Sequence, residues 1–492
     1  MKPAEDLHQL IQSLSMSEKR FFKIHSSRHV IGGKNNYMRL FDAIARQDKY
    51  DEHEIKKKFH GETFIRHLPS EKHYLYGQVL DALNAYNRDK TFLSRYSNAI
   101  ISIEILFNRG LFSHVRKLIK RVRPDAVRLE KFSTLLMLQR WETLVHIQAE
   151  DDKNLNRSLQ EELRILDVIR NQTSIMRIAF NIQVQIDKGK ATPRFIRETE
   201  RELRKIFPPP PDIMSFWSKY YFHSGIGLLA TVSGKLLLRY TSYKEIKRTM
   251  DNSPQFIGEL PVIYHINMNN LVNVMFFLEK YDEVESLIGR QRVFLSENHL
   301  HIPNLERLVF YNTAESELFL YYKTGRHEKA AVLAHSIGND IRRAGANAHP
   351  SMYDLIFFMA VSMLMIGNYK EATKWLNRIL NAEKKINLRK ELLITSRILY
   401  LVILYETHDL LFENRLRAAR RYVQNEPLFG IHAETLDIFS MLVSFHAGKK
   451  NRAELVKRIS LLRKEVIRAN EKSLNKQFDF AGWMEKKIRF QS

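Results

Sequence analysis

Hydrophobic residues recur three or four positions apart along most of the chain, which is the spacing of one face of an α-helix. Residues 363–380, MLMIGNYKEATKWLNRIL, show the pattern on both sides of Gly367. The apolar positions on this period are Leu355, Ile356, Met359, Met363, Ile366, Tyr369, Ala372, Trp375, Leu376, Ile379 and Leu380. Polar residues such as Lys370 and Lys374 fill the opposite face. A glycine ends a helix at little cost because it accepts positive φ, so the stretch predicts two helices joined by a tight turn.

The same turn recurs along the chain. With Gly367 as the origin, equivalent turns are predicted at positions 110, 241, 279, 325, 367, 409 and 448, with weaker ones near Asp152 and Gly189. The last five intervals are 38, 46, 42, 42 and 39 residues. A period this steady predicts stacked helical hairpins, because each hairpin buries its apolar face on the next. We therefore expect an all-α fold, an α-solenoid of stacked hairpins with a period of about 40 residues, with an N-terminal helical region.

Two stretches add a family resemblance. GNYKEATKWLNRIL has a turn glycine, an aromatic residue two positions later and an alanine five positions later. TGRHEKAAVLAHSI keeps the glycine and the alanine, with His327 at the aromatic position. These features resemble the tetratricopeptide repeat (TPR) family, most clearly over 311–381 and only weakly before 270. The resemblance implies a right-handed helical solenoid that binds proteins or peptides on its concave face, and it implies no catalytic residues.

Interruptions in the pattern suggest a domain organisation. Pro208 to Pro211, in FPPPPDIM, impose an extended stretch that stops the preceding helix and forms a rigid elbow. We predict an N-terminal helical region at 1–90, helical hairpin repeats at 91–207, and TPR-like repeats at 212–492. The N-terminal region has short helices with N-caps expected at Asn36, Asp51 and Ser70. It is either a cap on the first hydrophobic end of the solenoid, which we favour, or a helix-turn-helix DNA reader.

Composition restricts the chemistry and the location. The 492 residues include no cysteine, which excludes disulfides, thiol nucleophiles and Cys-ligated zinc. The start MKPAEDLHQL has Glu5 and Asp6 where a signal peptide would become apolar, so we expect a cytoplasmic protein. The uncharged run 260–278 is long enough for a membrane span. It contains Pro261 and four asparagines, so we expect a buried helix pair and no membrane span.

Motifs for catalysis and cofactors are weak. GIGLLATVSGK, at 225–235, has six residues between Gly227 and Gly234, where a phosphate loop needs four before its Gly-Lys pair. We read it as helix interior. His25 and His29 lie four apart, but no zinc-protease pattern surrounds them. We therefore predict that the chain is not an enzyme and has no cofactor, no metal and no small-molecule substrate.

Charge indicates the kind of partner. The formal net charge is +23, and an excess of this size attracts acidic proteins and nucleic acids. The candidate polyanion-binding residues are Arg116, Lys117, Lys120, Arg121 and Arg123 in one segment and Lys56, Lys57 and Lys58 in another. At the C-terminus, aromatic residues that either cap the last repeat or anchor a partner are Phe478, Phe480, Trp483 and Phe490. We expect a non-enzymatic scaffold for an acidic protein or peptide partner, and the alternative is a nucleic-acid-binding protein.

Overall fold

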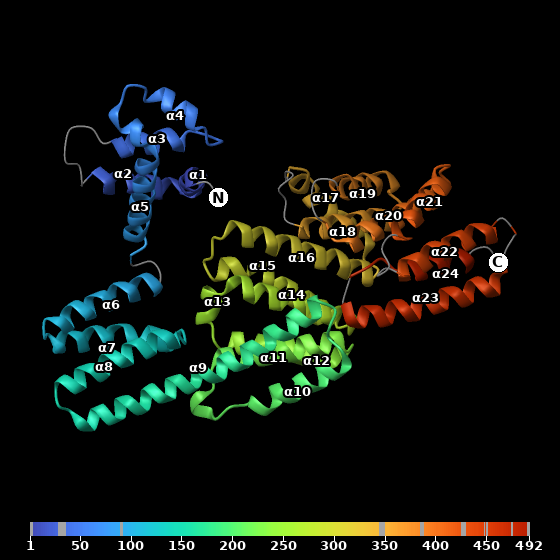
Figure 1. Cartoon of the computed structure of the whole chain (residues 1–492). Coiled ribbons are helices and arrows are strands. Elements are labelled where there is room, and N and C mark those ends of the chain that lie inside the picture. Colours follow the sequence, from blue (N-terminus) through green and yellow to red (C-terminus); the bar gives the residue numbers. More distant parts are fainter. Residues whose placement is uncertain are drawn as a thin grey trace. The chain divides into compact units, whose positions relative to one another are not determined.

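The computed structural model describes residues 3–27, 36–88, 92–343, 350–383, 388–424, 430–446, 448, 451–473 and 476–489. Within these residues all regular structure is helical, with 24 α-helices, two short 3₁₀ segments and no strand (Figure 1). Helices that are neighbours in sequence pack on one another, as in a solenoid, so the predicted all-α class is confirmed. The chain divides into two compact units, residues 1–166 (unit 1) and 167–492 (unit 2), which are described separately.

Unit 1 begins with five helices around a small hydrophobic cluster. They are α1 (Pro3–Ser13), α2 (Met16–Ser27), α3 (Asn36–Ala45), α4 (Glu52–Lys58) and α5 (Leu68–Tyr86), with the 3₁₀ segment Thr63–His67 before α5. The rings of Phe22 and Phe41 pack in this cluster with centroids 4.4 Å apart. Asp51 caps α4 as predicted, since its Oδ1 accepts from the backbone N–H groups of His53 and Glu54 at 2.9 and 3.2 Å. The N-cap predicted at Ser70 is wrong, because α5 already begins at Leu68.

Helical hairpins make up the rest of unit 1. They are formed by α6 (Phe92–Asn108), α7 (Phe112–Arg128), α8 (Phe132–Gln148) and the first part of α9 (Asp152–Asp187). Val115 and Ile119 of α7 are completely or almost completely buried. Because α7 packs against both α6 and α8, these apolar positions explain why the segment forms one side of a hairpin.

Unit 2 continues the hairpins to the end of the chain. Its first helices are the rest of α9, α10 (Pro193–Ile206), α11 (Phe216–Val232), α12 (Leu236–Asp251), α13 (Gln255–Glu259), α14 (Pro261–Phe277) and α15 (Tyr281–Glu297), with the 3₁₀ segment Pro211–Ile213. The later ones are α16 (Pro303–Lys323), α17 (His327–Arg343), α18 (Ser351–Met365), α19 (Tyr369–Ala382), α20 (Lys390–Glu406), α21 (Phe412–Gln424), α22 (Gly430–His446), α23 (Arg452–Ser473) and α24 (Phe480–Arg489). One hydrophobic core extends from Phe216 to Ile488.

The turns between hairpin helices share one backbone geometry. φ is positive at positions 110, 279, 325, 367 and 448, so these five predicted turns are confirmed, as is the weaker one at Gly189. The turn predicted at 409 lies one residue earlier, at His408. The turn predicted at 241 is wrong, since Thr241 is inside α12 and the positive φ is at Gly234. The prediction took Tyr243 as the first aromatic residue after a turn, but Tyr243 lies on the buried face in the middle of α12. From 234 to 448 the intervals are 45, 46, 42, 41 and 40 residues.

Two uncharged segments form helices of the core. The run 260–278 forms the single helix α14, so the predicted helix pair is wrong and the prediction of burial is confirmed. No helix among the described residues is both long and apolar enough to cross a membrane. GIGLLATVSGK belongs to α11 up to Val232, so the prediction that it is helix interior is confirmed for that part. A Cβ on Gly227 would lie 3.5 Å from the Cβ of Ser242, an ordinary van der Waals contact, so an alanine would also fit between α11 and α12.

The domain boundaries predicted at 90 and at 207–212 remain predictions. His29 and Phe490 lie outside the described residues.

Candidate interaction surfaces

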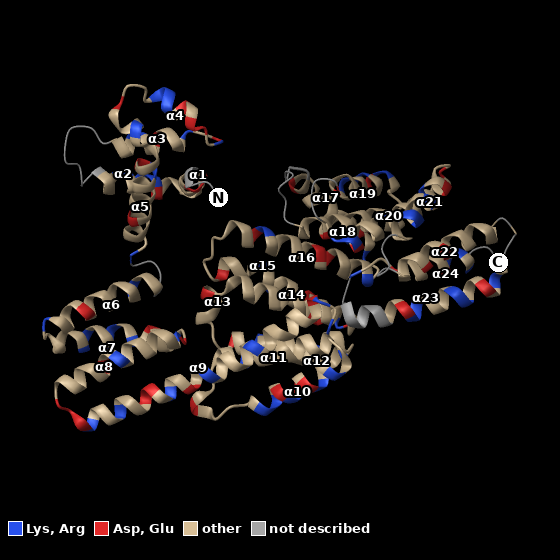
Figure 2. Ribbon diagram, viewed as in Figure 1, with Lys and Arg blue, Asp and Glu red and all other residues tan. Residues whose placement is uncertain are grey.

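Five of the eight predicted cations lie on α7, which carries blue segments in Figure 2. We define the α7 ridge as Arg116, Lys117, Lys120 and Arg121. Three of its side chains are exposed and that of Arg116 is half-buried. Within the described part of the chain, no carboxylate pairs with any of the four. The ridge is therefore a short group of cations whose charge is not neutralised by this part of the chain.

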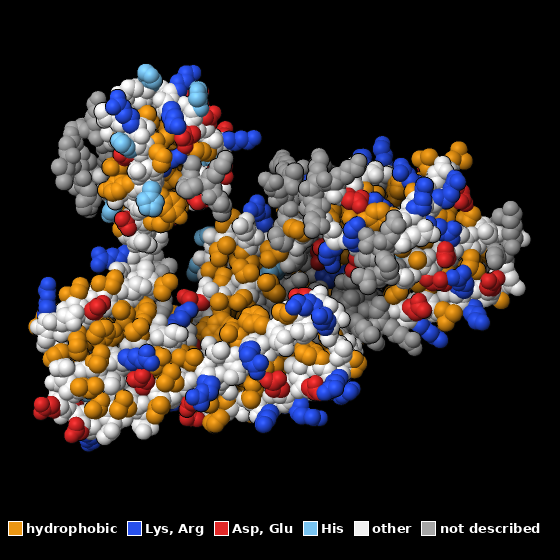
Figure 3. Space-filling view, in the orientation of Figure 1, with side chains coloured by type: hydrophobic (Ala, Val, Ile, Leu, Met, Phe, Trp, Pro, Cys, Tyr) orange, Lys and Arg blue, Asp and Glu red, His pale blue; other side chains and the backbone are white. Residues whose placement is uncertain are grey.

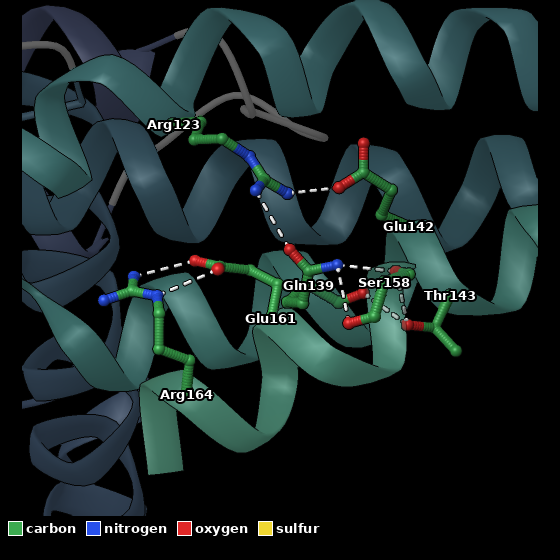
Figure 4. A network of polar contacts seen from close by, with 7 residues as sticks. All are labelled: Arg123, Gln139, Glu142, Thr143, Ser158, Glu161 and Arg164. Atoms are coloured by element: carbon green, nitrogen blue, oxygen red, sulfur yellow. Dashed lines mark hydrogen bonds and ion pairs between the residues drawn. The ribbon is translucent and has the colours of Figure 1, made fainter. Parts of the chain in front are cut away.

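Arg123 is hydrogen-bonded to α8 and belongs to a polar network that links three helices (Figure 4). Its guanidinium donates to Oε1 of Gln139 at 2.9 Å and to Oε2 of Glu142 at 2.5 Å. Gln139 in turn donates to Oγ of Ser158 on α9, which is also hydrogen-bonded to Thr143 at 2.8 Å. The structure thus uses this predicted polyanion-binding residue inside the unit, where it helps to hold α7, α8 and α9 together.

A second ion pair lies beside this network. Arg164 donates from Nε and Nη2 to the two carboxylate oxygens of Glu161, at 2.9 and 2.8 Å. The hydrogen bond from Arg164 lowers the pKa of Glu161, and the charges of Arg164, Arg123 and Arg157 lower it further. The charges on this side of the hairpins are therefore balanced by their neighbours, in contrast to the α7 ridge.

The lysines of α4 are partly neutralised. Lys56 lies 2.8 Å from one oxygen of Glu52, and Lys72 lies 2.6 Å from the other. Their hydrogen bonds, that of Lys56 first, lower the pKa of Glu52 to about 2. Lys58 lies 5.8 Å from the ring centroid of Phe59, and Lys57 is exposed. α4 packs on the cluster of α1 to α5, which has no residue of α7, so the structure places the predicted cations on two separate clusters.

Apolar side chains are exposed on α6 and α8, which contact each other (Figure 3). We define the α6–α8 stripe as Ile101, Ile105, Met137, Leu144 and Ile147. These side chains are 41–56% exposed. The residues of each helix are separated by three, four or seven positions and therefore share one face. Sequence analysis missed this stripe, because the same spacing also describes a buried face.

In unit 2, the first helices of two hairpins, α16 and α20, are covered by the chain's own end. We define the C-terminal segment as residues 476–489. Lys476 places its Nζ 2.9 Å from Oε2 of Glu315 and 2.8 Å from Oγ of Ser316, both on α16. Gln477 donates to Oε1 of Glu391, on α20, at 3.0 Å. Burial raises the pKa of Glu315, since water no longer solvates the charged carboxylate.

The rest of the C-terminal segment follows the same two helices. The backbone N–H of Asp479 donates to the hydroxyl of Tyr322 at 2.9 Å. Further along, Nε1 of Trp483 and Nζ of Lys487 both contact Glu406, at 2.7 and 2.6 Å. Of the predicted C-terminal aromatic residues, Phe478, Phe480 and Trp483 therefore fold back onto the core, in agreement with one of the two interpretations.

The described residues include no group of three or more His, Asp or Glu side chains placed to hold a metal ion. Comparison with models of known protein families gives no match to the chain, and comparison with curated proteins gives no match either. The class of protein is therefore defined by the fold itself, an all-α, solenoid-like stack of helical hairpins.

Proposed function

We propose that this chain is a non-enzymatic, TPR-like scaffold that binds an acidic protein partner through unit 1. The observation that supports the proposal is the α6–α8 stripe. Five large apolar side chains are 41–56% exposed on two neighbouring helices. Exposed apolar side chains are unremarkable singly, but grouped on one surface they mark a site where another protein binds.

The charge of the chain favours an acidic partner. The α7 ridge lies in the same unit as the stripe, and its four cations have no carboxylate partner among the described residues. The net charge of +23 would raise the rate at which an acidic protein encounters the chain. Apolar contact then supplies the affinity, and charge supplies the preference among partners.

A nucleic acid is the second candidate, through the α7 ridge or the lysines of α4. The ridge supplies four cations within six residues, whereas proteins that hold a duplex commonly make about 6–10 phosphate contacts. A charged phosphate backbone also makes no favourable contact with the apolar side chains of the α6–α8 stripe. These two points place the acidic protein first.

The test uses the full chain and a matched pair of variants. The stripe variant is Met137→Ser with Leu144→Ser, and the control is Val332→Ser, which changes a 70% exposed valine on α17. Quantitative affinity capture from a lysate should recover an acidic protein with the wild type and the control, and about ten-fold less with the stripe variant. Equal recovery with all three proteins, or recovery of no protein, would contradict the proposal.

Fluorescence anisotropy distinguishes the second candidate. Labelled duplex DNA and single-stranded RNA are titrated with the wild type and with a ridge variant, Lys117→Glu with Lys120→Glu, across a salt series. Binding that weakens steeply with salt and is lost in the ridge variant would put the nucleic acid first. We expect only weak binding at low salt.

A further inference from the structure

Carboxylates gather on the face of unit 2 that the C-terminal segment covers. Glu315, Glu391 and Glu406 lie on α16 and α20, and each is hydrogen-bonded by a side chain of residues 476–489. The partners are separated by 77 to 161 positions in sequence. These contacts therefore join a short peptide segment to a surface built by distant hairpins.

The first of these contacts is buried. The side chain of Lys476 is 5% exposed and that of Glu315 is 13% exposed. The ammonium also lies 5.3 Å from the ring centroid of Phe276, on α14. A carboxylate in such a place is stable as an anion only with a cation beside it, so the site selects a lysine at the first position of the segment.

Aromatic contacts select later positions. Phe478 stacks on Tyr322 with ring centroids 5.8 Å apart, and Phe480 is buried. Trp483 packs against Tyr405 and Phe439, with centroids 5.3 Å away in each case, while its Nε1 donates to Glu406. The surface thus recognises a lysine followed by aromatic residues two, four and seven positions later.

The surface also has unfilled space beside the segment. A solvent-open depression of about 460 Å³ is bordered mostly by residues of the segment itself, among them Phe478 and Trp483, and on the other side by Tyr322, His327 and Arg463. The surface beside the segment is therefore accessible to solvent on this side.

We propose that the face of α16 and α20 is a peptide-binding groove. Its ligand is a partner segment with a lysine followed by aromatic residues at the second, fourth and seventh positions after it. Residues 476–489 occupy this groove as a competing ligand. The groove lies in unit 2, so the proposal is independent of the surface proposed for unit 1. A tethered occupant acts at a high effective concentration and excludes a free peptide unless its own contacts are weakened.

The experiment weakens the resident segment in the full chain and supplies the same peptide in solution. The variant Lys476→Glu is titrated against a fluorescent synthetic peptide of residues 476–489 with the wild-type sequence. Breaking a buried ion pair weakens the resident by about 100-fold, so the variant should bind the peptide about 100-fold more tightly than the wild-type chain does. A peptide with Glu in place of its lysine should not bind.

Two controls make the result specific. Lys370→Glu, on the exposed side of α19, has the same change of charge and should behave like the wild type. Glu315→Lys should prefer the peptide whose lysine is replaced by Glu. If Lys476→Glu fails to fold by circular dichroism, Trp483→Ala with Lys487→Ala weakens the other end of the segment and should give the same response at smaller magnitude. A folded variant that binds no peptide, or one that binds it no better than Lys370→Glu does, would overturn the proposal and leave the segment as a structural cap.

Discussion

The hairpins of unit 1 and those of unit 2 differ in how far the apolar side chains of their first helices are exposed. In unit 1, α6 and α8 leave apolar side chains 41–56% exposed. In unit 2, α18 and α20 bury apolar residues on almost every side, and the C-terminal segment covers part of α20. The comparison teaches that one type of hairpin can either present an apolar face or have it occupied. A helix that is hydrophobic on all sides indicates the second case.

The largest expected effect comes from a charge placed in the core of unit 2. Ala372 of α19 is completely buried, so Ala372→Arg would bury an unpaired guanidinium and should cost about 4 kcal/mol or more. Hydrogen exchange of the full chain should rise throughout unit 2 while unit 1 keeps its protection. Asn377→Arg, on the exposed side of the same helix, is the control and should change neither unit. Equal loss of protection in both units would contradict the expectation that the charge destabilises unit 2 alone.

The second effect tests the covered face. Lys476→Ala leaves Glu315 buried without its cation and should lower the free energy of unfolding by about 3–5 kcal/mol. Lys487→Ala, whose side chain is 31% exposed, should cost about 1 kcal/mol or less. Urea denaturation monitored by circular dichroism measures both. Similar costs for the two lysines would show that burial does not distinguish the ends of the segment.

The third effect is a pH dependence of unit 2. Burial lowers the pKa of His265 and of His432 to about 4. Between pH 6.5 and 4 the unfolded chain binds protons that the folded chain does not, so stability falls as the pH falls. Each histidine should account for about 3 kcal/mol. The variants His265→Gln and His432→Gln should each flatten the plot of unfolding free energy against pH in this window, and an unchanged slope would contradict the assignment.

The fourth effect tests the polar network of unit 1. Arg123→Ala leaves Gln139 and Glu142 without their donor and should cost about 1–3 kcal/mol. Arg121→Ala removes a neighbouring cation of the α7 ridge and should stay within about 0.5 kcal/mol. Thermal unfolding measures both. Equal costs would mean that the ridge and the network are not distinct.

A small effect on stability should come from the α6–α8 stripe. Leu144→Ser changes a side chain that is already 41% exposed, so the free energy of unfolding should fall by only about 1 kcal/mol. Denaturant midpoints measured beside the wild type check this expectation. A large loss of stability would show that the stripe belongs to the core and is no surface for a partner.

Much of the fold follows from the spacing of hydrophobic residues. The period around Gly367 correctly predicted helical hairpins and five turns between 110 and 448. It failed at 241, because an aromatic residue on a helix face looks the same at the beginning of a helix and in its middle. Periodicity identifies a face and a turn, and the end of a helix depends on contacts made elsewhere.

The surfaces were less predictable. Lys117 and Arg123 look alike in sequence, but only the structure shows that Arg123 is hydrogen-bonded across α7 and α8. Pairing between residues as distant as Glu315 and Lys476 has no local signal at all. The sequence identifies the residues that can interact, and tertiary contacts decide which of them remain available.

The backbone of the turns has a consequence for how such a chain can diverge. Positive φ occurs at Gly110, Gly325 and Gly367 but also at Glu279 and His408. A Cβ on any of the three glycines would meet no atom within 4 Å, so the only obstacle to another side chain there is a modest conformational strain. Mutation can therefore erase the glycine hallmark of each junction while the bend itself persists. Repeats in a molecule of this kind are therefore better recognised by the backbone dihedral angles of their turns than by the amino-acid identities there.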